Sequence, residues 1–176
     1  MDFSSLKTAS AIPGAAAMIE TFRAIGYSLE TAVADIVDNS ISASARNVWI
    51  NRIWKGGDSV ITIRDDGHGM SGEEIIQAMR PGAQNPLEER SATDLGRFGL
   101  GLKTASFSQC RTLTVMSKIQ GQSPEFWTWS LDHVARCDRW ELVHWCPEGF
   151  EHELDDLASG TIVIWTDPDR IIPAAT

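Results

Sequence analysis

The chain lacks an apolar run long enough to cross a membrane, and it has few cysteines. A membrane-spanning helix needs about 18 or more consecutive apolar residues, and no such run occurs among the 176 residues. Residues 1–12 also lack the basic start and apolar core of a signal peptide. The three cysteines are odd in number and scattered, which fits a reducing compartment better than a disulfide scaffold. We therefore expect a cytoplasmic protein without a membrane partner.

Basic residues are scarce relative to acidic ones. The chain has 15 Lys and Arg against 24 Asp and Glu, which gives a formal net charge of -9. An acidic domain is unsuited to binding nucleic acid over a wide surface, because Lys and Arg must neutralise the phosphates. Contact with DNA is therefore expected only through other domains. An anionic ligand would need local positive potential from a lysine, a cation or a helix N-terminus.

Length and patterning predict one α+β domain spanning residues 1–176. Apolar periodicity and caps predict helices over 14–25, 29–45, about 71–80 and about 99–110. β-rich runs predict strands over 47–54, 60–65, 112–118, 125–131, 139–145 and 161–166. The polar segment 81–95 contains Gly, Pro and Asn, which indicates a long mobile loop. This order favours a mostly antiparallel mixed sheet covered by helices on one face.

One face of the predicted helix 29–45 carries only short polar side chains. The helical repeat places these residues on a common ridge: Thr31, Asp35, Asp38, Asn39 and Ser42. An ordinary solvent-exposed face is the simple alternative, but such faces usually carry Lys, Arg and Glu. Asp and Asn are mediocre helix formers away from the cap. Short oxygen-bearing groups suit a largely hydrated Mg²⁺ beside phosphates.

A second polar segment, Asp65-Asp66-Gly67-His68-Gly69-Met70, directly follows the strand 60–65. A tight turn between strand and helix explains it equally simply. In a binding site, the two glycines would let the backbone approach a flat ligand closely. The carboxylate would accept a hydrogen bond from an exocyclic amine.

A third segment, Gly96-Arg97-Phe98-Gly99-Leu100-Gly101-Leu102-Lys103, leads into a helix. Free backbone N–H groups and the helix N-terminus would cradle phosphate there, although a flexible hinge is the alternative. The segment is not a P-loop, because Leu102 separates the glycine from the lysine. It is not the dinucleotide fingerprint either, because its glycine spacing differs. Finally, Gly160-Thr161 opens the last strand, which is a common feature by itself.

In this order, the four segments resemble the motifs of the GHKL ATPases (gyrase, heat-shock chaperone, histidine kinase and MutL). The segment 35–41 resembles the N box, usually Glu-x-x-x-Asn, and Asp65-x-Gly67-x-Gly69 resembles the first glycine box. Gly96-x-x-Gly99-x-Gly101 resembles the second glycine box, in the lid, and Gly160-Thr161 resembles the closing strand motif. The resemblance covers about residues 20–166. The sequence of the lid is most similar to the lids of the MORC-like and prokaryotic MORC-related branch.

The resemblance implies a Bergerat-type two-layer sandwich with a mobile ATP lid over about 81–103, and a site for ATP with Mg²⁺. It assigns Mg²⁺ to Asn39, the adenine amine to Asp65 and the same base edge to Thr161. Gly67 and Gly69 would pass close to the nucleotide, and Met70 would cover the base. The remaining ATP-binding residues that it implies belong to the lid: Gly96, Gly99, Leu100, Gly101 and Lys103.

Asp35 stands where hydrolytic relatives usually carry Glu, the residue that orients the attacking water. Asp is shorter by one methylene, about 1.5 Å of reach, and such a misplacement can cost about a hundredfold in rate. We therefore predict slow ATP hydrolysis catalysed by Asp35, with lid closure working attached C-terminal domains or an ATP-dependent homodimer. A histidine protein kinase and a nucleotide sensor without turnover are the alternatives. The Asp35 carboxylate favours ATP hydrolysis over phosphate transfer to a histidine.

A zinc site is a further possibility. Four candidate ligands, His133, Cys137, His144 and Cys146, fall within fourteen positions. Zinc fingers use tighter paired spacings, so packed or exposed side chains are the better interpretation.

Overall fold

The structure is a computed structural model, and it describes residue 4, residues 6–82 and residues 101–171. Its helices are α1 (Ala15–Arg23), α2 (Leu29–Ser42), α3 (Gly72–Met79), α4 (Gly101–Phe107) and α5 (Leu131–Cys137). Its strands are β1 (Val48–Ile53), β2 (Val60–Asp65), β3 (Thr112–Lys118), β4 (Glu125–Ser130) and β5 (Gly160–Thr166). None of the helices in these ranges has the length and apolar character needed to cross a membrane.

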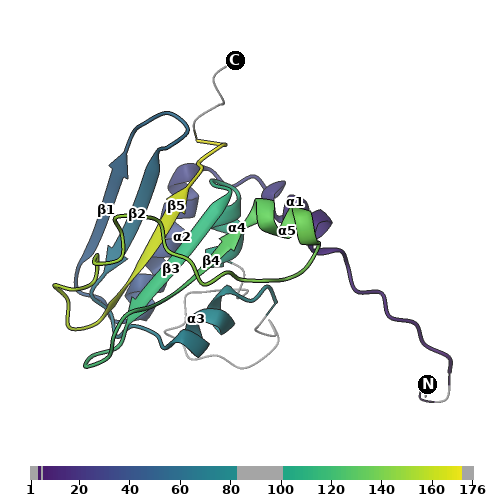
Figure 1. Ribbon diagram of the computed structural model, residues 1–176, viewed down its shortest axis with the longest axis horizontal. Helices are drawn as coiled ribbons and strands as arrows, with labels where there is room; N and C mark the ends of the chain where they lie inside the picture. The colour runs from purple at the N-terminus through teal and green to yellow at the C-terminus, as the bar shows by residue number, and fades with distance from the viewer. Residues whose placement is uncertain (1–3, 5, 83–100, 172–176) are drawn as a thin grey trace.

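The strands form a single sheet in the order β1-β2-β5-β3-β4 (Figure 1). Each neighbouring pair is antiparallel, so the described sheet is wholly antiparallel rather than mixed. The last strand, β5, lies between β2 and β3 and pairs Thr161 with both Asp65 and Ser117. Three segments that are far apart in the chain therefore meet at one end of the sheet.

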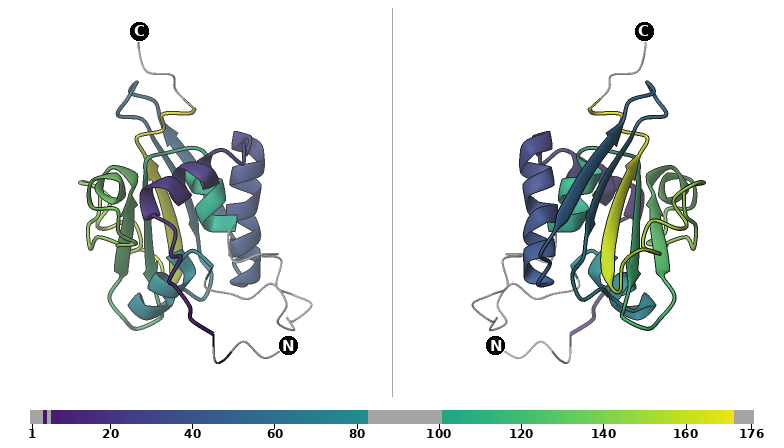
Figure 2. Two further views of the ribbon diagram at one scale, coloured as in Figure 1. Left: turned by 90° about the vertical axis from the view of Figure 1, so that its right-hand side faces the viewer. Right: turned by 90° about the vertical axis from the view of Figure 1, so that its left-hand side faces the viewer.

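Helices α1, α2 and α4 lie together on one face of the sheet (Figure 2). The main core lies between these helices and the sheet, and it includes Ile36, Ile63 and the fully buried Trp165. Burial of each such side chain contributes about 1.5–3 kcal/mol. The α+β fold with helices on one face is confirmed.

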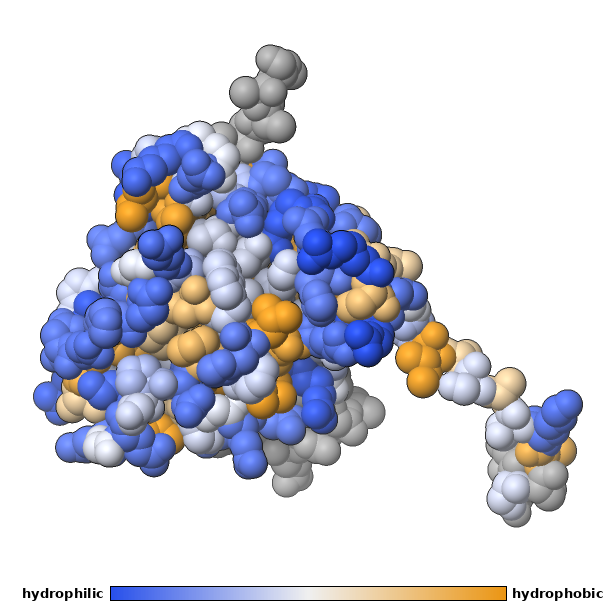
Figure 3. Space-filling model, viewed as in Figure 1, coloured by the Kyte–Doolittle hydropathy of each residue, from blue (hydrophilic) through white to orange (hydrophobic). Residues whose placement is uncertain are grey.

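A smaller apolar cluster lies apart from the main core. It consists of Met116, Ile162 and Ile164 from the sheet together with Leu154 from the irregular segment that precedes β5. This segment crosses the face that is viewed in Figure 1, opposite the α1–α2–α4 layer in Figure 2. Apolar residues lie there in small groups between hydrophilic ones (Figure 3).

Two helix starts follow the capping signals in the sequence. The Ser28 hydroxyl accepts from the backbone N–H of Thr31, at 3.2 Å, and begins α2. At α3, the Ser71 hydroxyl accepts from the N–H of Glu74, and the Glu74 carboxylate accepts from the N–H of Ser71. This reciprocal pair is the capping box, which satisfies two N–H groups that the helix itself leaves open.

The predicted strand 139–145 is wrong, and the short helix α5 was not predicted. Ser130 ends β4 and caps α5 by accepting from the N–H of His133, at 3.2 Å. The chain leaves the β4 edge of the sheet to form this helix. It meets β4 again only at Val143. There the backbone groups of Val143 and Thr128 exchange two 2.9 Å hydrogen bonds as an isolated bridge.

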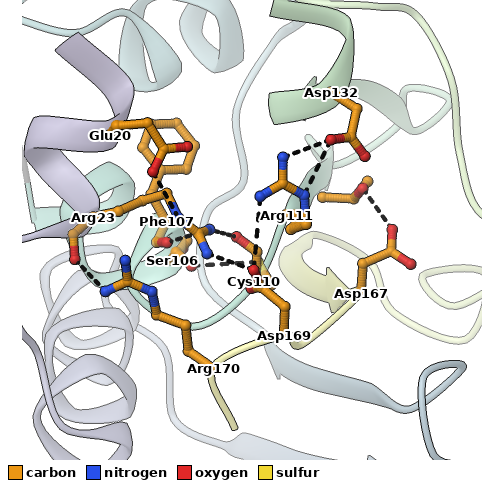
Figure 4. A network of polar contacts seen from close by, with 11 residues as sticks. Glu20, Arg23, Ser106, Phe107, Cys110, Arg111, Asp132, Asp167, Asp169 and Arg170 are labelled. Carbon is orange, nitrogen blue, oxygen red and sulfur yellow. Dashed lines mark hydrogen bonds and ion pairs between the residues drawn. The ribbon is translucent and has the colours of Figure 1, made fainter. Parts of the chain in front are cut away.

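A buried arginine joins α1, the end of α4 and the segment after β5 (Figure 4). The Arg23 guanidinium donates to the carbonyls of Phe107 and Cys110, at 2.9 and 3.0 Å, and pairs with the Asp169 carboxylate at 2.6 Å. Arg170 donates in turn to the Arg23 carbonyl. Burial raises the pKa of the Cys110 thiol well above its ordinary value, so this cysteine is an inert core side chain.

Candidate functional site

Asp65, the last residue of β2, presents a buried and firmly held carboxylate. Its exposed fraction is 5%. The Ser40 hydroxyl, on α2, donates to Oδ2 at 2.8 Å, and the Gly67 N–H donates to Oδ1 at 2.9 Å. Each carboxylate oxygen has two lone pairs. Asp65 can therefore accept a further hydrogen bond from a ligand while both protein bonds remain.

Thr161 joins the same site through Ser117, its partner on β3. The two hydroxyls lie 2.8 Å apart. The Ser117 hydroxyl also accepts from the Met70 N–H at 2.8 Å and donates to the Gly160 carbonyl at 3.0 Å. The structure thus brings together Asp65, Met70 and Thr161, as the motifs predicted. Ser40 and Ser117 were missed. Ser40 lies within the N box but is not one of its defining residues, and Ser117 lies outside all four motifs.

The two glycines of the 65–70 segment allow close packing of the protein on itself. A Cβ on Gly67 would lie 2.8 Å from the Ala43 Cβ and 2.9 Å from its carbonyl oxygen. Gly69 has a φ of +75°, and its Cβ would lie 2.0 Å from the Lys118 carbonyl oxygen. A side chain therefore does not fit at either position, because neighbouring atoms of the protein occupy the place of its Cβ. The predicted approach of these glycines to a nucleotide remains a prediction.

Asp35 lies on α2 beside the start of α4. Its Oδ2 is 3.5 Å from the position that a Cβ on Gly101 would take. Burial raises the pKa of the Tyr27 phenol, and the charge of Asp35 and a hydrogen bond to it raise this pKa further. Asp35 is therefore a half-buried carboxylate held next to the N-terminus of a helix. The residues Gly96, Gly99 and Leu100 lie outside the described residues.

Lys103 has a different environment from the one predicted. Its ammonium donates to the carbonyls of Ala78 and Arg80, at 2.8 and 3.1 Å, at the end of α3. The residue is 2% exposed, and burial lowers its pKa to about 8. Lysine in this position stabilises the free carbonyls at a helix C-terminus. Binding of phosphate by Lys103 remains a prediction. The two carbonyls use two of the three N–H donors of the ammonium, so one donor is left for another acceptor.

Asn39, the predicted magnesium ligand, is exposed and directly precedes Ser40 on α2. One turn of α2 therefore carries the candidate metal ligand and the hydroxyl that holds Asp65. Asp35 and Asp38 are half-buried on the same helix. Carboxylate and amide oxygens are ligands that Mg²⁺ accepts, usually one or two beside several waters. The donor set on α2 fits that ion.

The fold and this site together define a GHKL-type domain. The model of the family described as histidine kinase-, DNA gyrase B-, and HSP90-like ATPase matches residues 27–161. The chain therefore belongs to this family, whose ATPase domain supports ATP binding. The resemblance drawn from the four motifs is confirmed.

The chain is also similar to parts of larger proteins. It is 33% identical to the ATPase morc-1 of Caenorhabditis elegans over 91 residues, which cover 52% of this chain and 10% of that protein. It is 37% identical to the DNA mismatch repair protein MutL of Thermus aquaticus over 97 residues, or 54% of this chain and 17% of that protein. With MutL of Paramagnetospirillum magneticum, the identity is 29% over 132 residues, or 74% of this chain and 21% of that protein. The match spans only a tenth to about a fifth of these relatives' lengths.

Proposed function

We propose that this domain binds ATP with Mg²⁺ and hydrolyses it slowly to ADP and phosphate. The proposal rests on the Asp65 carboxylate, which Ser40 and Gly67 hold in a buried position. The exocyclic amine of adenine donates a hydrogen bond to such an acceptor, with the Thr161 hydroxyl supporting the same edge. Guanine carries a carbonyl oxygen at the equivalent position, and two acceptors cannot pair. The domain should therefore select ATP over GTP.

Asn39 is the proposed protein ligand of Mg²⁺. The bound ion would neutralise charge on the phosphates and on the transferring phosphoryl group. Asn39 follows Asp35 by one helical turn, so both side chains project toward one region beside α2. Gly101 begins α4 at the same place and would offer backbone N–H groups to the phosphates. The proposed phosphate contacts of Gly96, Gly99 and Leu100 complete the site.

Asp35 is the proposed catalytic residue, which orients the water that attacks the γ-phosphate. Its half-buried position beside Gly101, with a hydrogen bond from Tyr27, keeps the carboxylate in one place. Because Asp is one methylene shorter than Glu, the water is held less well. A displacement on that scale costs up to about a hundredfold in rate. Slow turnover follows.

Phosphate release by the purified domain tests this assignment. Wild type should release phosphate slowly from Mg²⁺-ATP. Asp35→Asn should abolish release while ATP still binds, and Asp35→Glu should raise the rate by about 10- to 100-fold. Glu30→Gln, which changes an exposed carboxylate in the first turn of α2, is the control and should keep the wild-type rate.

Other outcomes would point to the alternatives. Equal rates in wild type, Asp35→Asn and Asp35→Glu would remove Asp35 from catalysis. Binding of Mg²⁺-ATP without turnover in wild type would favour a nucleotide sensor. Labelled phosphate on a histidine of a partner protein would favour a kinase.

We further propose that ATP closes the lid over about 81–103 and moves attached C-terminal domains or a homodimer. The relatives support this extension, because each is several times longer than the matched region. Any contact with DNA would lie on other domains, since this chain carries a net charge of -9. Light scattering with a non-hydrolysable ATP analogue tests dimerisation. A doubled mass only with nucleotide supports it, and a monomer mass under both conditions opposes it.

A further inference from the structure

Three side chains with metal-binding atoms meet at the end of α5. His133 and Cys137 are four residues apart on this helix and therefore share one face. Glu141 comes from the turn that follows the helix. One ligand atom from each residue lies within 4.8 Å of the other two, and all three residues are half-buried. We propose that His133, Cys137 and Glu141 bind Zn²⁺, with water as the fourth ligand.

The distances between the ligand atoms suit a tetrahedral zinc ion. His133 Nε2 lies 3.3 Å from Glu141 Oε2, and Cys137 Sγ lies 3.9 Å from the same oxygen. Zinc bonds of about 2.0–2.3 Å at tetrahedral angles separate neighbouring ligand atoms by about 3.3–3.7 Å. Two of the three separations are therefore already close to these values. Small side-chain rotations bring the atoms onto the ion.

The chemistry of the donors favours zinc over the magnesium of the nucleotide site. Thiolate and imidazole are ligands of zinc, whereas Mg²⁺ prefers oxygen alone. A thiolate and a carboxylate together balance the charge of the ion. The Cys137 thiol releases its proton to solvent on binding, and His133 binds through Nε2 as neutral imidazole. Arg139 pairs with the other oxygen of Glu141, Oε1, at 3.1 Å, so Oε2 keeps facing the helix.

The turn that brings Glu141 back to the helix is held by contacts of its own. Asp138 ends α5 in the left-handed conformation, with φ 49° and ψ 39°. Its N–H donates to the Val134 carbonyl at 2.8 Å, and its carboxylate accepts from the Ala16 N–H at 3.0 Å. Trp140 packs edge-on against Trp129. The backbone between Cys137 and Glu141 is therefore held in place without an ion.

The other two zinc candidates in the sequence lie elsewhere. His144 stacks on Phe126, with ring centroids 4.4 Å apart. Cys146 packs against the smaller apolar cluster, and burial raises the pKa of its thiol to about 11. Glu141 takes their place in the structure. Cys146 is also half-buried, which makes it a matched control for Cys137.

Titration of the full chain with Co²⁺ tests the site. The protein should be free of purification tags, stripped with a chelator, kept reduced and free of nucleotide. Wild type should bind one equivalent of Co²⁺ with a sulfur-to-cobalt charge-transfer band, which Zn²⁺ then abolishes by displacement. An oxygen-only magnesium site cannot give this band.

Substitutions assign the ligands. Cys137→Ser should lose the charge-transfer band and weaken Zn²⁺ binding by more than the roughly 100-fold that loss of an outer partner can cost. Glu141→Gln should keep the band but weaken binding. Cys146→Ser should match wild type in both respects. Equal Zn²⁺ affinity in wild type and Cys137→Ser, or loss of the band only in Cys146→Ser, would overturn the proposal.

Thermal unfolding separates lost binding from lost folding. Without metal, Cys137→Ser should unfold at the temperature of wild type. Saturating Zn²⁺ should raise the midpoint of wild type, because a ligand that binds only the folded state stabilises it. The midpoint of Cys137→Ser should stay unchanged. An equal rise in both proteins would place the zinc site elsewhere.

Discussion

The hydroxyl of Ser40 donates a 2.8 Å hydrogen bond to the carboxylate of Asp65, and so joins α2 to the end of β2. The two residues are 25 positions apart in the chain. Because Asn39 directly precedes Ser40, the same helical turn places the proposed metal ligand and orients the proposed adenine acceptor. One turn of α2 therefore connects the two parts of the proposed nucleotide site.

Removal of the Ser40 hydroxyl should weaken ATP binding. A buried hydrogen bond to a charged group is worth about 1.5 kcal/mol or more, so Ser40→Ala should lower ATP affinity by about tenfold. Isothermal titration calorimetry with Mg²⁺-ATP measures this loss. Ser42→Ala, which removes an exposed hydroxyl from the same helix, is the control. An equal loss in both variants would contradict a specific role for Ser40.

A methyl group on Gly69 should destabilise the fold through a collision with β3. Its Cβ would lie 2.0 Å from the Lys118 carbonyl oxygen, in addition to the strain of a φ of +75°. Left-handed strain costs about 1–2 kcal/mol and overpacking about 1–3 kcal/mol more. Gly69→Ala should therefore lose about 2–5 kcal/mol of unfolding free energy, measured with denaturant.

Gly56→Ala is the control that measures the cost of left-handed strain without a collision. Gly56 has a φ of +59°, but nothing lies within 4 Å of the position of its Cβ. This variant should lose only about 1–2 kcal/mol. Equal losses at Gly56 and Gly69 would mean that the backbone at Gly69 moves away from β3 without cost.

Loss of the Arg23 guanidinium should destabilise the contact between α1 and the segment after β5. Arg23→Met would leave the buried carbonyls of Phe107 and Cys110 without their donor. Because Asp169 is about one third exposed, its charge can be solvated, which limits the cost. We expect a loss of about 2–4 kcal/mol of unfolding free energy in denaturant. Arg52→Met, at an exposed position, should lose almost nothing, and a similar loss there would count against the network.

Lys103 should make stability depend on pH. Its folded pKa is about 8, against an ordinary value of 10.5, because burial disfavours the charged form. Between these two values the unfolded chain binds more protons than the folded one, so stability increases as pH rises. From pH 7 to pH 9, the unfolding free energy of wild type should rise by about 1 kcal/mol relative to Lys103→Met. A constant difference would show that the ammonium keeps an ordinary pKa.

The sequence predicted the elements that follow local rules. The helical repeat and Ser28 predicted α2, and the serine-to-glutamate spacing predicted α3. The motif resemblance, rather than a local rule, assigned Asp65 and Thr161 to one base edge, and β2 and β5 do pair these two residues. Local patterns succeeded at α2 and α3, whose capping partners lie within one turn, but they missed α5 and predicted a strand over 139–145 that does not form.

Contacts between distant segments could not be predicted in the same way. Ser117 joins Thr161 across 44 positions, and nothing in the pattern of β3 marks this serine. The motif resemblance assigned Lys103 to phosphate, but its ammonium donates to the carbonyls at the end of α3. Glu141 was not among the candidate zinc ligands, which were all His or Cys. Only the turn after α5 brings its carboxylate to Cys137. Each of these placements depends on tertiary packing.

The most direct test of the central claim compares two adjacent carboxylates in one calorimetric experiment with Mg²⁺-ATP and Mg²⁺-GTP. Asp65 is proposed to accept from adenine, whereas Asp66 accepts from the backbone N–H groups of Arg46 and Asn47. Wild type should bind ATP and not GTP. Asp65→Asn should lose ATP binding while Asp66→Asn, once shown to be folded, retains it. Unchanged ATP affinity in Asp65→Asn, or equal binding of both nucleotides by wild type, would contradict the account.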